Sequence, residues 1–127
     1  MRLNATKEAE GARLTLVFGA LADPTRRDLV ARLAVGDASV GELAASYDVS
    51  VQAISKHLKV LEGAGLVTKT AAAQRRVVHL EAEVFELMTA WIARYERQVE
   101  ERYRRLDDVL AHLDQNGQLA TPEKRTS

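Results

Sequence analysis

The sequence of 127 residues contains no cysteine, which excludes disulfide bonds, thiolate metal ligands and a cysteine nucleophile. It has no run of about 18 apolar residues and no charged segment leading into an apolar one, so we expect neither a membrane span nor secretion. A Gly-rich phosphate loop, a Gly-x-Ser-x-Gly motif and a His-Glu-x-x-His motif are also missing, which disfavours an enzyme. The apolar fraction of 46% is typical of one globular domain, and we expect it in the cytoplasm.

An excess of charge of either sign is missing as well. The 18 basic and 18 acidic residues cancel, and a neutral chain at first disfavours nucleic acid as a partner. The distribution is uneven, however: residues 50–80 hold five cations and one anion, whereas residues 81–115 hold five arginines and nine acidic residues. One region attracts phosphate and the other repels it, so the pattern favours a protein that is oriented on DNA.

Residues 50–67 predict a helix with two different faces. Its apolar positions recur at steps of three and four and indicate a buried stripe: Val51, Ile54, Leu58 and Leu61. The opposite face is polar or cationic: Gln52, Ser55, Lys56 and Lys59. Ser50 is placed as an N-cap and Gly65 as a left-handed closing residue. Gln, Ser and Lys bond base edges and phosphates, so this face is a candidate DNA-reading surface. An ordinary amphipathic surface helix is the alternative.

A short helix is expected immediately before this one. Ser39 and Glu42 have the spacing of a capping box and predict a helix over residues 40–47. Two short helices joined by a tight turn, the second with a polar outer face, form a helix-turn-helix.

Two further helices precede this pair. Asp23 and Pro24 supply a cap and a first residue for a helix over residues 24–35. An earlier helix is expected over residues 12–21. Residues 1–11 are polar and without periodicity, so we expect a mobile tail there.

A basic β-hairpin is expected after Gly65. Residues 66–70 and 75–80 are rich in β-branched side chains and partly alternate. Residues 71–74 contain no Gly, Asn or Asp, which predicts a connection longer than a tight two-residue primed turn, or a mobile one. A basic hairpin after a helix-turn-helix is a wing, and three of its side chains are expected near the DNA backbone or minor groove: Lys69, Arg75 and Arg76.

No Gly or Pro interrupts residues 82–115, which predicts one helix about 50 Å long. So small a domain cannot bury the whole apolar stripe of this helix, so a second copy of the chain is expected to cover it. An intramolecular core helix is the alternative. The expected dimer contacts are apolar residues of the first and last helices: Leu14, Phe18, Met88, Trp91, Ile92, Tyr95, Val99, Tyr103, Leu106 and Leu110. Residues 116–127 are expected to form a mobile tail.

The segments LADPTRRDLVARL and ELAASYDVSVQAISKHLKVLEGAGLV, followed by a basic hairpin and a long last helix, resemble the ArsR-type winged-helix repressors of bacteria. The resemblance covers residues 12–115 and is greatest to the branch with a long C-terminal helix and no thiol sensor. It implies a mainly α fold with a small β-hairpin wing, a dimeric winged helix-turn-helix. It also implies a homodimer in the bacterial cytoplasm, associated with the nucleoid, that binds a palindromic operator and represses transcription, often of its own operon.

The resemblance assigns DNA contacts to the predicted recognition helix and wing: Ser50, Val51, Gln52, Ser55, Lys56, His57, Arg75 and Arg76. Charge and position add Lys59 and Lys69. On a helical wheel His57 lies at the flank of the apolar stripe, so it either bonds a phosphate or packs and bonds internally.

The sequence departs from many members of that family in its lack of a sensor. Ala44, Ala45 and Ser46 stand where relatives place a pair of cysteines, and His112 is the one histidine of the last helix. Zinc or nickel would require three or four N, O or S ligands, so we expect no metal and no cofactor. The alternatives are a winged-helix protein-interaction module without an operator and a metal- or ligand-responsive repressor with a non-thiol site.

Overall fold

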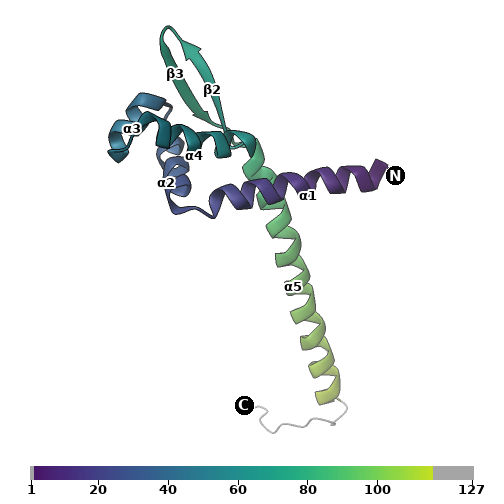
Figure 1. Cartoon of the computed structure of the whole chain (residues 1–127). Coiled ribbons are helices and arrows are strands. Elements are labelled where there is room, and N and C mark those ends of the chain that lie inside the picture. Colours follow the sequence, from purple (N-terminus) through teal and green to yellow (C-terminus); the bar gives the residue numbers. More distant parts are fainter. Residues whose placement is uncertain (1, 116–127) are drawn as a thin grey trace. The chain divides into compact units, whose positions relative to one another are not determined.

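The computed structural model describes the backbone of residues 2–115 and the side chains of residues 6–115. The elements follow one another as α1 (Arg2–Leu21), α2 (Pro24–Val35), β1 (Ala38–Ser39), α3 (Val40–Tyr47), α4 (Val51–Gly63), β2 (Val67–Ala72), β3 (Arg75–Leu80) and α5 (Glu83–Gln115) (Figure 1). The chain divides into two units, Met1–Met88 and Thr89–Ser127, and the division falls inside α5. The predicted mainly α fold with a β-hairpin is confirmed. None of the helices within residues 2–115 is both long and apolar enough to cross a membrane.

Helix α1 begins at Arg2, so the prediction that the first helix begins at Ala12 is wrong. The segment before Ala12 contains Ala, Lys and Glu, which favour helix without forming an apolar stripe. Periodicity therefore missed a segment that intrinsic propensity would have found. The tail predicted for residues 116–127 lies outside the described residues.

The predicted helix starts are confirmed by their caps. The backbone N–H of Arg26 donates to Asp23 Oδ2 at 3.0 Å, and Pro24 is the first residue of α2. Ser39 and Glu42 form the reciprocal capping box of α3: Glu42 N–H donates to Ser39 Oγ at 3.1 Å, and Ser39 N–H donates to Glu42 Oε1 at 2.8 Å. These short-range bonds fix where α2 and α3 begin.

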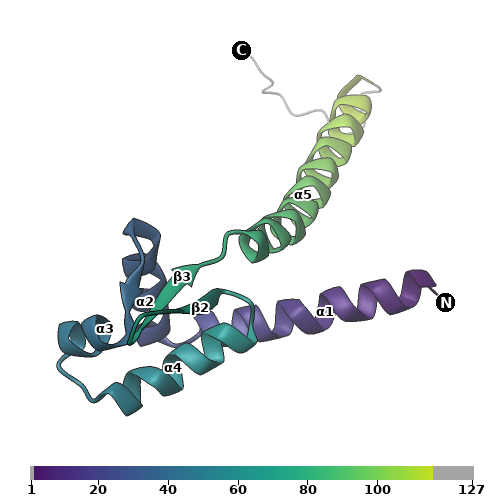
Figure 2. The same cartoon turned by 90° about the horizontal axis from the view of Figure 1, so that it is seen from above.

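The turn between α3 and α4 makes the helix-turn-helix (Figure 2). Asp48 closes α3 in the left-handed region, with φ 55°, and its backbone N–H bonds carbonyls of the last turn. Ser50 caps α4 by accepting from Ala53 N–H at 3.1 Å. Gly65 follows α4 at φ 79°, a conformation that glycine adopts without steric cost. Both predicted ends of the organising helix are confirmed.

The three strands form an antiparallel sheet in the order β1-β3-β2. Ala72 pairs with Arg75, so the hairpin connection consists of Ala73 and Gln74 alone. The prediction of a longer connection is wrong. Ala73 adopts φ 58°, and Gln74 is not among the residues of positive φ, so alanine takes the left-handed conformation at the first connecting residue, where a tight hairpin turn usually has glycine, Asn or Asp.

The core of the first unit draws on every element of that unit, including the first turn of α5 (Val84). Its largest fully buried side chains are aliphatic: Val17, Leu29, Leu43, Ile54, Leu58, Leu61, Leu66, Val67, Val78 and Val84. Three of these belong to α4, so this helix is fixed to the domain along one face, and the position of its opposite face is determined with it.

Candidate nucleic-acid interface

Helix α4 is anchored by Ile54, Leu58 and Leu61, which are at most 1% exposed. Val51, predicted to share this buried stripe, is 53% exposed instead. The sequence reasoning was wrong here because Val51 is the first residue of α4, and the core does not extend to that end of the helix. Val51 therefore joins the outward surface.

The outward face of α4 forms a hollow of about 800 Å³, here called the α4 groove. Ten residues line it: Arg26, Ser50, Val51, Gln52, Ala53, Ser55, Lys56, His57, Lys59 and Val60. The structure thus brings together all seven residues of the α4 region that the sequence assigned to DNA contact, with no acidic residue in the lining. Gln52, Lys56 and Lys59 are exposed at the groove. It offers amide, hydroxyl and ammonium groups, as base edges and phosphates require.

Arg26 of α2 also lines this groove, and the sequence reasoning did not select it. Its Nε donates to the Ala20 carbonyl at 2.7 Å, so the guanidinium is held at the C-terminal end of α1. The sequence did contain a signal for this placement. Arg26 lies three residues after the cap Asp23, in the first turn of α2, and from there its side chain extends back toward the N-terminal end of the helix.

His57 bonds within the protein, as one of its two predicted fates required. Its Nδ1 lies 3.4 Å from Arg26 Nη1 and 3.9 Å from Asp23 Oδ2. A guanidinium only donates, so a hydrogen bond between these two groups requires Nδ1 as the acceptor and therefore the tautomer with its proton on Nε2. A phosphate contact through Nε2–H is compatible with this arrangement, because His57 also lines the groove.

Asp23 stays ionised beside these groups. The backbone N–H of Arg26 bonds its carboxylate, and together with the nearby charge of Arg26 this bond holds the pKa of Asp23 below the ordinary value. An anion at this position compensates Arg26 and maintains the local charge balance at the edge of the α4 groove.

The β2–β3 hairpin, the wing, extends beyond α3 and α4 (Figure 1). A second hollow of about 410 Å³, here called the wing groove, lies between the tip of the hairpin and the first residues of α3 and α4: Ser39, Val40, Gly41, Val51, Ser55, Gln74, Arg75 and Arg76 line it. Val51 and Ser55 line both grooves, so the polar surface of α4 continues into the wing.

Two of the three predicted wing cations have carboxylate partners within the chain. Lys69 Nζ lies 3.6 Å from Glu62 Oε1, and only 16% of the Lys69 side chain is exposed. Arg75 Nη2 lies 3.2 Å from Glu42 Oε1. Among residues 6–115, no ion pair forms at Arg76. The wing therefore presents less uncompensated positive charge than its sequence predicted.

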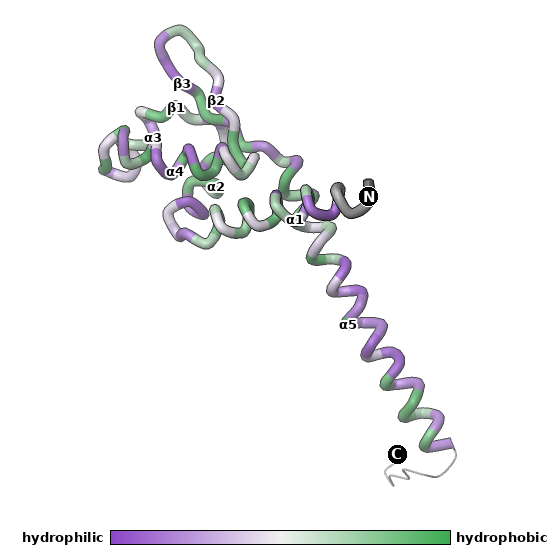
Figure 3. The backbone as a smooth tube through the Cα atoms, turned by 45° about the vertical axis from the view of Figure 1, so that its right-hand side comes forward, coloured by the Kyte–Doolittle hydropathy of each residue, from purple (hydrophilic) through white to green (hydrophobic). Residues whose placement is uncertain are grey.

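Helix α5 carries a row of exposed apolar side chains from Thr89 onward, where Figure 3 shows hydrophobic residues recurring between hydrophilic ones. These residues are between 43% and 61% exposed: Ile92, Tyr95, Val99, Tyr103, Leu106, Val109 and Leu110. Ile92, Val99, Leu106 and Leu113 are spaced by seven residues, the repeat of a coiled coil. Trp91 packs edge-to-face on Tyr95, with ring centroids 4.8 Å apart.

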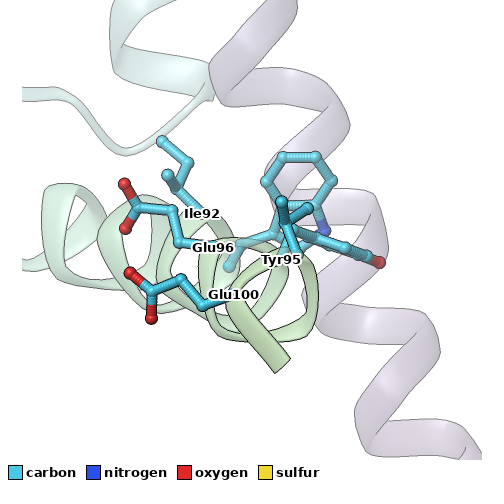
Figure 4. A pocket seen from close by; sticks show the side chains of 6 residues that line it. Ile92, Tyr95, Glu96 and Glu100 are labelled. Atoms are coloured by element: carbon cyan, nitrogen blue, oxygen red, sulfur yellow. The ribbon is translucent and has the colours of Figure 1, made fainter. Parts of the chain in front are cut away.

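A hollow of about 470 Å³ lies along this stretch of α5, lined by Trp91, Ile92, Tyr95, Glu96, Val99 and Glu100. Figure 4 shows Glu96 and Glu100 extending side by side along one flank of the helix. Of the other predicted dimer contacts, Met88 is partly buried against the core of the first unit, Leu14 is half-buried and Phe18 is 37% exposed.

Metal-ligating side chains do not cluster in the described part of the chain. Within residues 6–115, no three of the His, Asp and Glu side chains come together as a metal site would require.

A family model described as a helix-turn-helix domain matches residues 21–70. The HTH-type transcriptional regulator Rv2034 of Mycobacterium tuberculosis is 55% identical over 62 residues, and the match covers 49% of this chain and 58% of that regulator. The transcriptional repressor SdpR of Bacillus subtilis is 30% identical over 79 residues, which are 62% of this chain and 88% of that protein. The crystal structure of an ArsR family transcriptional regulator superimposes with a TM-score of 0.66 at 36% identity, covering 71% of this chain and 93% of the other. The chain belongs to the ArsR family of transcriptional regulators.

Membership of the ArsR family agrees with where the match lies. Residues 21–70 include α2, α3, α4 and the start of β2, and therefore the whole α4 groove. The winged helix-turn-helix that the resemblance implied is confirmed, and the chain is a DNA-binding regulator of transcription by family.

Proposed function

We propose that this ArsR-family chain is a homodimeric, sequence-specific repressor that binds an inverted repeat, including one upstream of its own gene. The α4 groove carries the proposal: one face of α4 is fully buried, while Gln52, Ser55, Lys56 and Lys59 line the other. A rigidly anchored helix that presents short polar and cationic side chains fits the major groove of DNA.

The side chains of the α4 groove have separate roles in this proposal. Gln52 and Ser55 stand in the first turns of α4 and read base edges, Gln by paired hydrogen bonds to adenine and Ser by single ones. Lys56 and Lys59 hold the backbone phosphates or guanine edges. Arg26 and the Nε2–H of His57 add donors for phosphate at the flank of the same groove.

Dimerisation through α5 supplies the second copy of α4 that contacts DNA. The exposed apolar row with its seven-residue repeat is the kind of surface that a second copy of the same helix covers. Two copies of α4 related by a two-fold axis read two half-sites about one helical turn, or ~34 Å, apart, which is why an inverted repeat is expected.

Repression, rather than activation, is supported by the name of the Bacillus subtilis relative, a transcriptional repressor. A dimer seated on an operator that overlaps a promoter excludes RNA polymerase from it. This activity places the protein in the bacterial cytoplasm, at the nucleoid when bound.

A gel shift with the DNA upstream of its own gene, in the presence of random-sequence competitor, tests the proposal. We expect a specific complex whose footprint shows two symmetric half-sites. Binding that ignores sequence at every salt concentration would instead favour a winged-helix protein-interaction module without an operator. Release of the operator by zinc, nickel or arsenite would point to a sensor.

Gln52→Ala tests base reading within that assay. We expect it to weaken operator binding by roughly 1–3 kcal/mol and to leave random-sequence binding almost unchanged, because base contacts carry sequence information and phosphate contacts do not. Ser55→Ala should behave alike. Gln115→Ala, an amide removed from an exposed position of α5, is the matched control and should bind as the natural chain does. Equal losses on both DNAs would contradict base reading by α4.

A further inference from the structure

One carboxylate oxygen joins the wing to the start of α3. Glu42 Oε1 accepts from the backbone N–H of Ser39 at 2.8 Å and from Arg75 Nη2 at 3.2 Å. The capping box fixes this oxygen independently of the wing, because Glu42 N–H also bonds Ser39 Oγ at 3.1 Å. Arg75 is thus drawn to an anion whose position is set by the helix terminus.

This pair lies at the surface that faces DNA in the proposed function. Arg75 lines the wing groove together with Ser39 and with Val51 and Ser55 of α4. The side chains of Arg75 and Glu42 are 60% and 56% exposed, so a phosphate can reach the guanidinium. Hydrogen bonds from Ser39, first its backbone N–H and then its hydroxyl, lower the pKa of Glu42, which therefore stays charged at neutral pH.

We propose that Glu42 is a determinant of DNA affinity that acts as an intramolecular competitor: its carboxylate holds the position that a DNA phosphate takes on Arg75. The inference rests on the proposed function and adds to it a residue that opposes binding. When DNA binds, Arg75 exchanges the carboxylate of Glu42 for a phosphate. The binding free energy that Arg75 contributes is then only the difference between the two contacts. Glu42 is then left as an unpaired anion close to the DNA backbone.

The competitor also reduces the salt dependence of binding. Each phosphate neutralised by a cation releases condensed counterions and contributes about −0.9 to the slope of log K against log salt. A carboxylate that loses its cation takes up a counterion from solution, which offsets part of this release. Glu42 therefore lowers both the affinity and the steepness of the salt response.

Glu42→Gln removes the charge and keeps the cap, because Gln also serves as the third residue of a capping box. Exposed ion pairs of this kind correspond to about two- to fivefold in an equilibrium constant, so a dimer with two wings should gain roughly 4- to 25-fold in affinity. The slope should become steeper by up to about one for each wing. Both effects should be equal on the upstream DNA and on a random-sequence duplex, because phosphate contacts carry no sequence information.

A double-mutant cycle separates competition for Arg75 from general repulsion of DNA. The four proteins are the natural chain, Glu42→Gln, Arg75→Gln and the double variant, titrated by fluorescence anisotropy with both duplexes over a range of salt. Competition predicts that Arg75→Gln costs more affinity in the Glu42→Gln background than in the natural one. Glu10→Gln is the control: it removes the same charge from α1, outside both grooves, and should leave the DNA affinity and the slope of log K against log salt unchanged. Thermal melting verifies that each variant folds.

The outcomes separate this inference from the proposed function. A natural chain that binds neither duplex would refute both the proposed function and the competitor role of Glu42. A natural chain that binds DNA, with Glu42→Gln unchanged in affinity and slope, would overturn the competitor alone. A gain that persists in full when Arg75 is already Gln would also overturn it, because Glu42 would then act on DNA directly and not through Arg75.

Discussion

The wing tip offers a direct test of the backbone conformation at Ala73. This residue adopts φ 58° as the first residue of a connection that contains only Ala73 and Gln74. For an L-residue with a Cβ, the left-handed region is unfavourable by about 1–2 kcal/mol. Glycine has no Cβ and no steric cost in this region, so Ala73→Gly should relieve this strain.

The expected gain is smaller than the strain, because glycine also loses more conformational freedom when it folds. That entropy cost is about 0.5–1 kcal/mol relative to alanine. The difference leaves a net stabilisation of roughly 0.5–1 kcal/mol for Ala73→Gly. For a chain of this size, such a change corresponds to a rise in melting temperature of about 2–4 °C.

The assay is thermal and urea unfolding at fixed protein concentration, with the adjacent alanine as the control. Ala72 belongs to β2, where φ is not positive, so Ala72→Gly should destabilise the protein by about 0.5–1 kcal/mol. The two substitutions remove the same methyl group one residue apart and should have opposite signs. If Ala73→Gly destabilises as much as Ala72→Gly, the turn does not have this conformation in solution.

Three other perturbations test the interface and the local tertiary bonds. Val99→Asp should dissociate the dimer in sedimentation and abolish operator binding, whereas Val35→Asp, at a position 89% exposed on α2, should do neither; an intact Val99→Asp dimer would move the interface elsewhere. Tyr47 donates to Asp28 Oδ2 at 2.6 Å, and Tyr47→Phe should cost about 1 kcal/mol in urea unfolding. Burial, then the Asp28 bond, raises the pKa of Tyr47 from the ordinary 10.0 to about 12. The stability that depends on the protonated hydroxyl should therefore be fully present below pH 10.0 and be lost as the pH rises from there to about 12. A cost of Tyr47→Phe that does not change with pH would contradict this. The lowered pKa of Asp23, due first to the Arg26 backbone N–H, contributes stability above the ordinary carboxyl pKa of about 4 that is lost in acid. Because Asn also caps helices, Asp23→Asn should fold at neutral pH and lose less stability between neutral pH and pH 3 in thermal melts; an unchanged acid limb would refute this assignment.

The sequence predicted the helix-turn-helix well because its boundaries are set by local chemistry. Asp23, Ser39, Ser50 and Gly65 each act within about one helical turn, and each does so in the structure as predicted. The face that α4 presents follows from its apolar spacing once those ends are fixed. A reading surface built on one short helix is therefore accessible from sequence alone.

What the sequence could not give depends on contacts between distant residues. Strand β1 consists of Ala38 and Ser39, too short for any pattern, and exists because β3 pairs with it. The partner of Arg75 is Glu42, 33 residues earlier, and no spacing rule connects them. Counting charges along the chain treated such a cation as available, whereas the fold brings a carboxylate to it.

The distribution of partners changes where DNA affinity is expected to arise. A chain with no net charge binds a polyanion only through a surface from which its own anions are absent. The wing does not meet this condition, since Glu42 and Glu62 lie against Arg75 and Lys69. The α4 groove comes closer to it: Lys56 and Lys59 line the groove without an acidic residue, and the one carboxylate described at its edge, Asp23, lies 3.9 Å from His57 Nδ1. Salt sensitivity should therefore come mainly from α4 in the natural chain, and the share of the wing should grow only when its carboxylates are removed.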